Sequence, residues 1–334
     1  MIEVSAGVVR RGDGCVLICQ RGEGRHNAHR WEFPGGKLEA GETPEACLRR
    51  ELTEELSLPV TDVRPLCDRE AEGLRFHFLT ACTAGEPALT EHEAAAFVRP
   101  RAMLTYDFCP ADAPVAQALA VNDPPLRHFF WDFDGTVMDT YPSTVAAFLR
   151  AAERLNVRVD AGEALALMKR SLPRCFRETA AAHALDEAAL RAAFWEEEKN
   201  IRVSEARPID GIPETLRALS ARGGRHYLVT HRNRLAIDYL KATGLDTLFV
   251  DFITEEDGFP RKPAPDSLRY LMERHGLDAA ECVMIGDRPL DTAAGRGAGM
   301  LSCLLDEDGR FPDDPCELRT DTARRLTAML TGEL

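Results

Sequence analysis

Features of a membrane protein or of a nucleic-acid-binding protein are missing from this sequence. No apolar run approaches the length that spans a bilayer, and the first residues, MIEVSAGVVRRGDG, lack the charged and apolar regions of a signal peptide. Positive charge is scarce, because 41 Lys and Arg residues stand against 55 Asp and Glu residues and leave a formal net charge of -14. We therefore expect a soluble protein that binds neither membranes nor nucleic-acid duplexes, although a small basic pocket is compatible with this charge.

Cysteine pairs with a recognised spacing are also lacking. The ten cysteines are scattered through the chain, with no CxxC and no zinc-type spacing. This arrangement is typical of reduced thiols and predicts a cytoplasmic protein.

The length of 334 residues favours two domains, since a single core seldom grows this large. The segment VNDPPLR, residues 121–127, has adjacent prolines and no apolar periodicity. We place the boundary there, and predict a first domain of residues 1–122, a linker of residues 123–128 and a second domain of residues 129–334.

The first domain has the pattern of a mixed α/β unit. IEVSAGVVR and CVLICQR flank the turn residues RGDG and predict a hairpin. The remaining pattern predicts strands near residues 60–65, 75–83 and 96–99, and helices at residues 43–57 and 112–120.

The second domain alternates apolar strands with long helical stretches. HFFWDF, RHYLVT at 225–230 and CVMIGD at 282–287 have this pattern, which indicates a parallel sheet with crossover helices. An alanine-rich span at about 143–207 has helical periodicity and no strand signal, so it predicts a helical insert. Both domains are therefore α/β.

Three glutamates gather on one predicted helix of the first domain. Glu51, Glu54 and Glu55 fall in one sector, beside an apolar stripe of leucines. Carboxylates this close repel one another unless cations join them, and such hard oxygen ligands suit Mg²⁺ or Mn²⁺. For the helix alone, a solvated acidic face neutralised by Arg49 and Arg50 is the favoured alternative.

The spacing of residues before and within this helix favours the metal site over the solvated acidic face. In this sequence a glycine, a glutamate and an Arg-Glu-Leu-x-Glu-Glu run follow one another at a spacing that resembles the box of the Nudix hydrolases. The matching residues are Gly36, Glu42, Arg50, Glu51, Glu54 and Glu55. The resemblance covers about residues 1–120, is closest to the MutT type of nucleoside triphosphate pyrophosphohydrolase, and implies an α/β/α sandwich. Ser57 replaces the last glycine of the pattern, which puts the geometry of that turn in doubt.

The resemblance implies roles for the residues of the box and of later segments. Glu54 and Glu55 would bind metal with the Gly36 carbonyl, Glu51 would be a ligand or the general base, and Glu91 in EHEAAAFV an auxiliary ligand or base. Arg21 and His26 lie where this group contacts its substrate, although His26 fits solvated surface equally well.

Asp112 replaces the asparagine found in the bacterial enzyme that removes 8-oxoguanine nucleotides. A carboxylate only accepts hydrogen bonds, so Asp112 would prefer a base edge with donors, such as guanine-type edges or the cytosine amino group. An ordinary helix N-cap before Pro114 is an equal alternative.

The second domain carries polar side chains where its predicted strands end. Asp132 and Asp134 in WDFDGT follow the first strand, and Thr230 and Asp287 end the next two, with Asp291 close behind. Ligands collect at the carboxyl ends of strands in a parallel sheet. Taken alone, DFDGT fits a capped turn slightly better than a site.

Four stretches in order are similar to the four motifs of the haloacid dehalogenase superfamily: DFDGT, VTHRN, RKPAPDS and GDRPLD. The resemblance covers about residues 127–308, and the span at 143–207 resembles the helical cap of this family. By this resemblance Asp132 would be the nucleophile and Asp134 the acid and base, which implies phosphoryl transfer. Thr230 and Lys262 would hold phosphoryl oxygens, and Mg²⁺ would be bound by Asp132, the Asp134 carbonyl, Asp287 and Asp291.

Four cations of the predicted cap, Lys169, Arg170, Arg174 and Arg177, are candidates to contact the group next to the phosphate. A solvated helix face is the favoured alternative for them.

The whole sequence therefore predicts a bifunctional hydrolase that uses Mg²⁺, or Mn²⁺, in both domains. Its substrates would be a nucleoside triphosphate and a phosphomonoester, either the resulting nucleotide or a small molecule similar to phosphoglycolate. The alternatives are a nucleotide-sensing Nudix domain that regulates the second domain, and a phosphomutase in the second half. The oligomeric state stays open.

Overall fold

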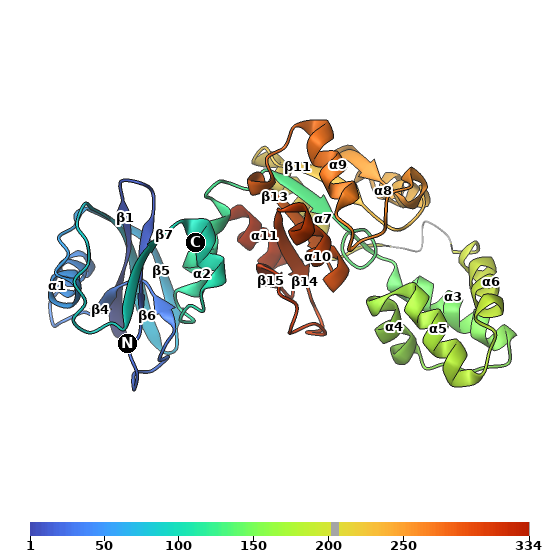
Figure 1. Cartoon of the computed structure of the whole chain (residues 1–334), viewed down its shortest axis with the longest axis horizontal. Coiled ribbons are helices and arrows are strands. Elements are labelled where there is room, and N and C mark those ends of the chain that lie inside the picture. The colour runs from blue at the N-terminus through green and yellow to red at the C-terminus, as the bar shows by residue number, and fades with distance from the viewer. Residues whose placement is uncertain (202–206, 334) are drawn as a thin grey trace. The chain divides into compact units, whose positions relative to one another are not determined.

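The computed structural model describes residues 1–201 and 207–333 and divides into two compact units. The first contains Met1–Pro125 and Ala328–Leu334, and the second Leu126–Thr327. Figure 1 shows a sheet with helices in each unit. None of the described helices is long and apolar enough to cross a membrane. The domain limits and the cytoplasmic location stay predictions.

The first unit is built on a mixed sheet. Its elements are β1 (Ile2–Arg11), β2 (Val16–Gln20), β3 (Trp31–Glu32), β4 (Gly35–Lys37), α1 (Pro44–Leu56), β5 (Thr61–Ala71), β6 (Leu74–Thr83), β7 (Ala94–Val98), a 3₁₀ turn at Pro100–Thr105 and α2 (Ala113–Val121). The strand order is β3-β2-β1-β6-β5, with β4 paired to β1 and β7 to β2. Because β1 and β6 are parallel and the other pairs antiparallel, the predicted mixed sheet is confirmed.

Alternate side chains of the strands serve two cores, one on each face of this sheet. On β2, Leu17 packs with Leu48 and Leu52 of α1, whereas Ile18 packs with Val115 of α2. Successive side chains of a strand point to opposite faces, so each helix covers its own face. The result is the expected α/β/α sandwich.

Helix α1 begins and ends at residues that satisfy its free backbone groups. Thr43 is the N-cap, and its hydroxyl accepts the amide of Ala46 at 3.2 Å. Ser57 adopts the left-handed conformation, with φ 48°, and its amide bonds the carbonyls of the last turn. The turn therefore keeps its geometry although serine stands in place of glycine.

The second unit has a parallel sheet. Its strands are β8 (His128–Trp131), β11 (Arg225–Val229), β12 (Phe249–Ile253), β13 (Cys282–Gly286), β14 (Leu301–Leu305) and β15 (Leu318–Thr320), in the order β12-β11-β8-β13-β14-β15. Its crossover helices are α7 (Ile212–Ala221), α8 (Leu235–Thr243), α9 (Asp266–His275) and α10 (Pro289–Ala298), with 3₁₀ turns at Asp246–Leu248, Glu255–Asp257 and Ala279–Glu281. Helix α11 (Ala323–Thr331) follows the last strand. The predicted parallel sheet is confirmed, since all of these strand pairs are parallel.

The predicted insert contains α3 (Tyr141–Arg154), α4 (Ala161–Arg170), α5 (Leu172–His183) and α6 (Glu187–Glu198). These helices share their own core, in which Phe148, Phe176 and Phe194 meet. The expectation of no strand in this span is wrong at its end, because β10 (Arg207–Pro208) pairs with β9 (Met138–Asp139). A two-residue strand is too short to give a periodic signal. Positions 202–206 of the predicted insert lie outside the described residues.

All ten cysteines are free, as the spacing predicted.

Candidate active sites

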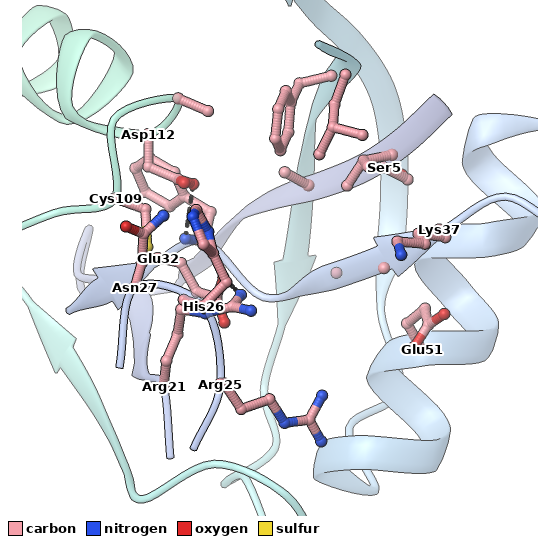
Figure 2. A pocket seen from close by; sticks show the side chains of 18 of the residues that line it. Ser5, Arg21, Arg25, His26, Asn27, Glu32, Lys37, Glu51, Cys109 and Asp112 are labelled. Carbon is pink, nitrogen blue, oxygen red and sulfur yellow. Dashed lines mark hydrogen bonds and ion pairs between the residues drawn. The ribbon is translucent and has the colours of Figure 1, made fainter. Parts of the chain in front are cut away.

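The first unit contains a cavity of about 430 Å³ between the sheet and the box helix. Its lining brings together most of the residues that the Nudix resemblance predicted: Arg21, His26, Gly36, Glu51, Glu55, Glu91 and Asp112. Figure 2 shows Asp112 and Glu32 at one end of this cavity and Glu51 on α1 at the other. Glu54 is not part of the lining, and its side chain is 60% exposed.

A close backbone approach joins β4 to the helix at Gly36. A Cβ atom at this position would lie 2.2 Å from Oε1 of Glu51, so any other residue would displace that carboxylate. The Gly36 carbonyl accepts the Cys47 thiol at 3.4 Å. This approach places the Gly36 backbone and the Glu51 carboxylate in one small space, as a shared metal ligand set would require.

Arg50 organises the glutamates of the box. Its guanidinium donates to Glu51 at 2.8 Å, to Glu54 at 3.2 Å and to Glu42 at 3.0 Å. Arg49 instead pairs with Glu45 on the helix surface. Arg50 therefore neutralises the box glutamates, as the alternative proposed, but it does so inside the box rather than on a solvated face. Arg49 does not take part.

Glu55 is far less exposed than Glu54 and is flanked by a histidine that the sequence reasoning missed. Burial raises the pKa of Glu55 to about 7, and the nearby carboxylates of Glu51 and Glu91 add to the rise. His92 lies 3.8 Å from Glu55 and 3.4 Å from Glu32. A bound divalent cation would relieve this repulsion, so the residues fit a metal site. The only sequence signal for His92 is its place beside Glu91 in EHEA.

The residues predicted to contact the substrate, Arg21 and His26, differ in whether other protein groups fix their side chains. The Arg21 guanidinium forms an ion pair with Glu32 and donates to the His26 carbonyl at 2.8 Å. The His26 side chain is 75% exposed, although its residue borders the cavity. Glu91 forms an ion pair with Arg25 at the cavity edge.

Asp112 is buried, and its carboxyl bonds another segment instead of capping helix α2. Its Oδ1 accepts the backbone amide of Phe33 at 3.0 Å, and its side chain makes no capping bond to α2. Asp112 therefore stands at the predicted N-cap position of α2, but its side chain does not cap the helix. Burial raises the pKa of Asp112 to about 8. A neutral carboxyl donates as well as accepts, so this shift favours a second bonding role beside the predicted acceptor.

In the second unit, the strand register brings the predicted residues to one edge of the sheet. Trp131 is level with Leu228 and Ile285, so Asp132 follows β8 where β11 and β13 end. Carboxylate oxygens of Asp132, Asp287 and Asp291 all lie within 4.8 Å of one another. Such a buried trio suits a hard divalent cation.

Lys262 lies in the middle of this cluster. Its Nζ is 2.6 Å from Asp132 and 2.7 Å from Asp291, and it donates to the Val229 carbonyl at 2.8 Å. Lys262 is not a surface charge, since its side chain is only 1% exposed. Thr230, the residue after Val229, is also buried, and its hydroxyl accepts the Arg232 amide at 3.0 Å.

The carboxylates differ in ionisation because their neighbours differ. Burial disfavours ionised Asp132, but Lys262 and Arg288 outweigh it and lower its pKa. Burial raises the pKa of Asp287 to about 7 and also raises that of Asp291. Oδ1 of Asp287 is buried and accepts no hydrogen bond from the described residues, although Arg288 Nε lies 3.5 Å away. A metal ion fits this oxygen.

Close glycine approaches also shape the second site. At Gly135, a Cβ atom would lie 2.5 Å from Oδ2 of Asp287. At Gly286, it would lie 2.3 Å from the Cβ of Asp291. A side chain at either glycine would therefore enter the space of a site carboxylate, Asp287 or Asp291.

Asp134 is held by side chains that the sequence reasoning missed. Arg232 donates to Asp134 at 2.8 Å and 3.0 Å, and Thr140 donates at 2.6 Å. Arg232 also reaches Glu198 of α6 at 3.1 Å. Arg232 is the residue after His231 in VTHRN, so its position in a matched motif was the available signal.

Arg288 and Tyr141 were also missed. Arg288 donates to Oδ2 of Asp132 at 3.2 Å, and the Tyr141 hydroxyl donates to Oδ2 of Asp287 at 3.0 Å. Among the predicted cap cations, Lys169 lies 4.0 Å from Asp287 and 3.7 Å from Asp308. The solvated-face alternative is therefore wrong for Lys169. Arg174 pairs with Glu178, and Arg170 and Arg177 are exposed.

Comparison with known proteins gives matches for both halves. Residues 1–119 match the model of the NUDIX domain, and residues 129–305 match that of the haloacid dehalogenase-like hydrolases. The chain is 36% identical over 124 residues to the 8-oxo-dGTP diphosphatase of Haemophilus influenzae, which covers 36% of this chain and 91% of that protein. It is 31% identical over 212 residues to the plasmid phosphoglycolate phosphatase of Cupriavidus necator, which covers 60% of this chain and 91% of that protein.

A solved structure adds evidence on the fold. A haloacid dehalogenase-like family protein from Streptococcus pneumoniae matches with a TM-score of 0.53 at 18% identity, covering 61% of this chain and 97% of that one. This similarity supports the fold of the second unit.

Proposed function

We propose that this chain, which belongs to both the Nudix and the haloacid dehalogenase-like hydrolase families, cleaves a nucleoside triphosphate in its first half and a phosphomonoester in its second. Both families are hydrolases, so the chain is an enzyme. The observation that supports two activities is that the second unit carries a buried carboxylate trio, while the first unit has a separate cavity lined by carboxylates that include Glu51, Glu55 and Glu91.

In the first half, water attacks a phosphorus of the triphosphate chain, and the products are a nucleoside monophosphate and pyrophosphate. Mg²⁺, which Glu51, Glu54, Glu55 and the Gly36 carbonyl would hold, supplies charge neutralisation at the phosphate oxygens. Glu51 or Glu91 takes the proton of the attacking water, since both border the cavity. Arg21, fixed by Glu32, binds the substrate.

In the second half, an oxygen of Asp132 bonds to the phosphorus as the ester oxygen leaves, and gives an aspartyl-phosphate. Asp134 gives its proton to the leaving oxygen and then removes one from the water that hydrolyses this intermediate. Lys262 and Thr230 hold the phosphoryl oxygens. Mg²⁺, which Asp132, Asp287, Asp291 and the Asp134 carbonyl would hold, supplies charge neutralisation in both steps.

The two activities form a sequence if the second half accepts the nucleoside monophosphate that the first half releases. The similarity to a phosphoglycolate phosphatase favours a smaller substrate as the competing choice. A sensor or a mutase remains the alternative outcome of the same assay.

A panel of oxidised and canonical nucleoside triphosphates, with phosphoglycolate and nucleoside monophosphates, tests this proposal. With Mg²⁺ we expect pyrophosphate from a triphosphate, followed by phosphate from its monophosphate, and neither after chelation by EDTA. Binding of triphosphate without pyrophosphate release would support the sensor instead. Sugar-phosphate isomers in place of free phosphate would support the mutase.

Asp112 gives a prediction about base recognition and pH. Because its pKa is about 8, Asp112 is neutral below that pH and donates a hydrogen bond to the base, and it loses this donor as pH rises through 8. We expect kcat/KM for dGTP to fall between pH 7 and pH 9 by about tenfold more in the wild type than in Asp112→Asn, since the amide keeps its donor.

The measurement is the ratio of wild-type to variant kcat/KM at each pH, which cancels the effects of pH on metal and phosphate. Parallel profiles for the two proteins would contradict a neutral, donating Asp112.

A further inference from the structure

The two carboxylate oxygens of Asp134 have different surroundings. Nε and Nη2 of Arg232 donate to Oδ1 at 3.0 Å and 2.8 Å, and the Thr140 hydroxyl donates to the same oxygen at 2.6 Å. Among residues 1–201 and 207–333, no donor forms a hydrogen bond to Oδ2. Oδ1 is therefore fixed by the protein, whereas Oδ2 is left to act on a substrate.

Arg232 is itself held from several directions. Its side chain is only 11% exposed, and its guanidinium carbon lies 5.9 Å from the centre of the Tyr239 ring. Its backbone amide donates to the Thr230 hydroxyl at 3.0 Å, and its carbonyl accepts the Glu255 amide at 2.9 Å. Because a guanidinium is a rigid planar fork, one held in this way sets the orientation of the carboxylate that it binds.

The remaining nitrogen of this guanidinium reaches the cap. Nη1 of Arg232 donates to Oε1 of Glu198 at 3.1 Å, and Glu198 is the last residue of α6. The other donor to Asp134, Thr140, stands directly before α3. The first and the last helix of the cap therefore both contribute to the hold on Asp134, one directly and one through Arg232. A lysine carries all its donors on one nitrogen and could not span both carboxylates as this fork does.

The chemistry of the second half needs a proton at one particular atom. When the bond from phosphorus to an alkoxide leaving group breaks, Asp134 gives its proton to the departing oxygen. Because Oδ1 accepts three hydrogen bonds, that proton is carried on Oδ2. The negative charge that remains on the carboxylate then lies against the Arg232 guanidinium, which stabilises it. One contact thus both orients the acid and favours release of its proton.

We propose that Arg232 is the positioning residue that orients Asp134 for protonation of the leaving group, and that Glu198 of the cap holds Arg232 in place for this step. This inference rests on the proposed phosphomonoesterase function of the second half. It concerns one event of that reaction, the departure of the ester oxygen.

The test compares two kinds of phosphomonoester in the full chain with Mg²⁺. The first has an alkoxide leaving group, which needs a proton, and is whichever of deoxyguanosine monophosphate and phosphoglycolate the wild type hydrolyses faster. The second is p-nitrophenyl phosphate, whose phenolate leaves without a proton. The measured quantity is the ratio of their kcat/KM values, alkyl over aryl, which compares the two transition states of attack by Asp132.

We expect this ratio to fall by at least about tenfold in Arg232→Gln and in Arg232→Lys, because a misaligned acid loses part of the 10²–10⁴-fold that general acid catalysis typically contributes. Lysine keeps the positive charge, so a fall in that variant reports the lost geometry. Glu198→Gln should lower the ratio in the same direction and by less, and this near-isosteric change should fold if the Arg232 variants do not. Arg234→Gln, an exposed arginine that lies 3.5 Å from Glu256, is the matched control and should leave the ratio unchanged.

Asp134→Asn separates this inference from the function on which it rests. If the alkyl ester is lost selectively in Asp134→Asn while the ratio stays unchanged in the Arg232 variants, the positioning role is overturned and the acid remains. A fall of both rates together in the Arg232 variants leaves the ratio unchanged, so a merely structural role would be recognised. An unchanged ratio in Glu198→Gln removes the cap from the proposal. If the wild type hydrolyses neither kind of ester, nor any other phosphomonoester, the proposed function itself fails.

Discussion

The variant Asp132→Asn is expected to lose release of phosphate from phosphomonoesters by more than about 10³-fold, because an amide cannot replace the attacking carboxylate. Asparagine keeps the size of the side chain, so the loss would report chemistry rather than packing. Lys262 and Arg288 both lie against this carboxylate and lower its pKa, so they favour the ionised form that attacks.

Phosphate release from a nucleoside monophosphate and pyrophosphate release from a triphosphate are measured on the same preparation. Pyrophosphate release should stay at the wild-type level, because the first site lies in the other unit. Asp238→Asn removes an exposed carboxylate of α8, paired with Lys241, and is the matched control. Phosphate release by Asp132→Asn near the wild-type rate would end the assignment of the nucleophile.

The variant Glu55→Gln is expected to lose pyrophosphate release by at least about 10²-fold, since a neutral amide offsets less of the charge of a divalent cation. Glu55 lines the cavity from the box helix, and its pKa is raised to about 7 by burial and by nearby carboxylates. Binding of Mn²⁺ measured by calorimetry should weaken in parallel.

The same variant tests whether the two halves act in order. If they do, phosphate release from a triphosphate disappears in Glu55→Gln, whereas phosphate release from the monophosphate persists. Glu45→Gln, on the exposed first turn of the same helix, is the control and should change neither. Wild-type pyrophosphate release by Glu55→Gln would remove this residue from the metal site.

The elements that were predictable have strong local signals. Helix α1 carries a Thr-Pro start and an apolar stripe, and both appear in the structure from Pro44 to Leu56. The parallel strands of the second unit are short buried runs, and β8, β11 and β13 lie where these runs occur. Asp132, Asp287 and Asp291, which the strand ends and the four motifs predict at one edge of the sheet, lie together in the structure.

The parts that escaped prediction depend on contacts between distant segments. His92 meets Glu55 only because the loop before β7 folds beside the box helix, and Arg288 meets Asp132 only across the sheet register. The ionisation of Asp112 depends on its burial, which no local pattern encodes. Lys169 was assigned to solvent because helical periodicity does not show what lies opposite a helix face.

Gly36 and Gly286 have a consequence for how this protein can vary. At each, one added carbon would enter the space of a carboxylate, Glu51 in the first site and Asp291 in the second. At Gly286 the obstacle is the Cβ of Asp291, which is fixed to helix α10, so we expect even the smallest side chain to displace that carboxylate. At Gly36 the obstacle is the end of the flexible Glu51 side chain, so we expect a substitution there to shift the Glu51 carboxylate. Each change would therefore act on one of the two sites alone.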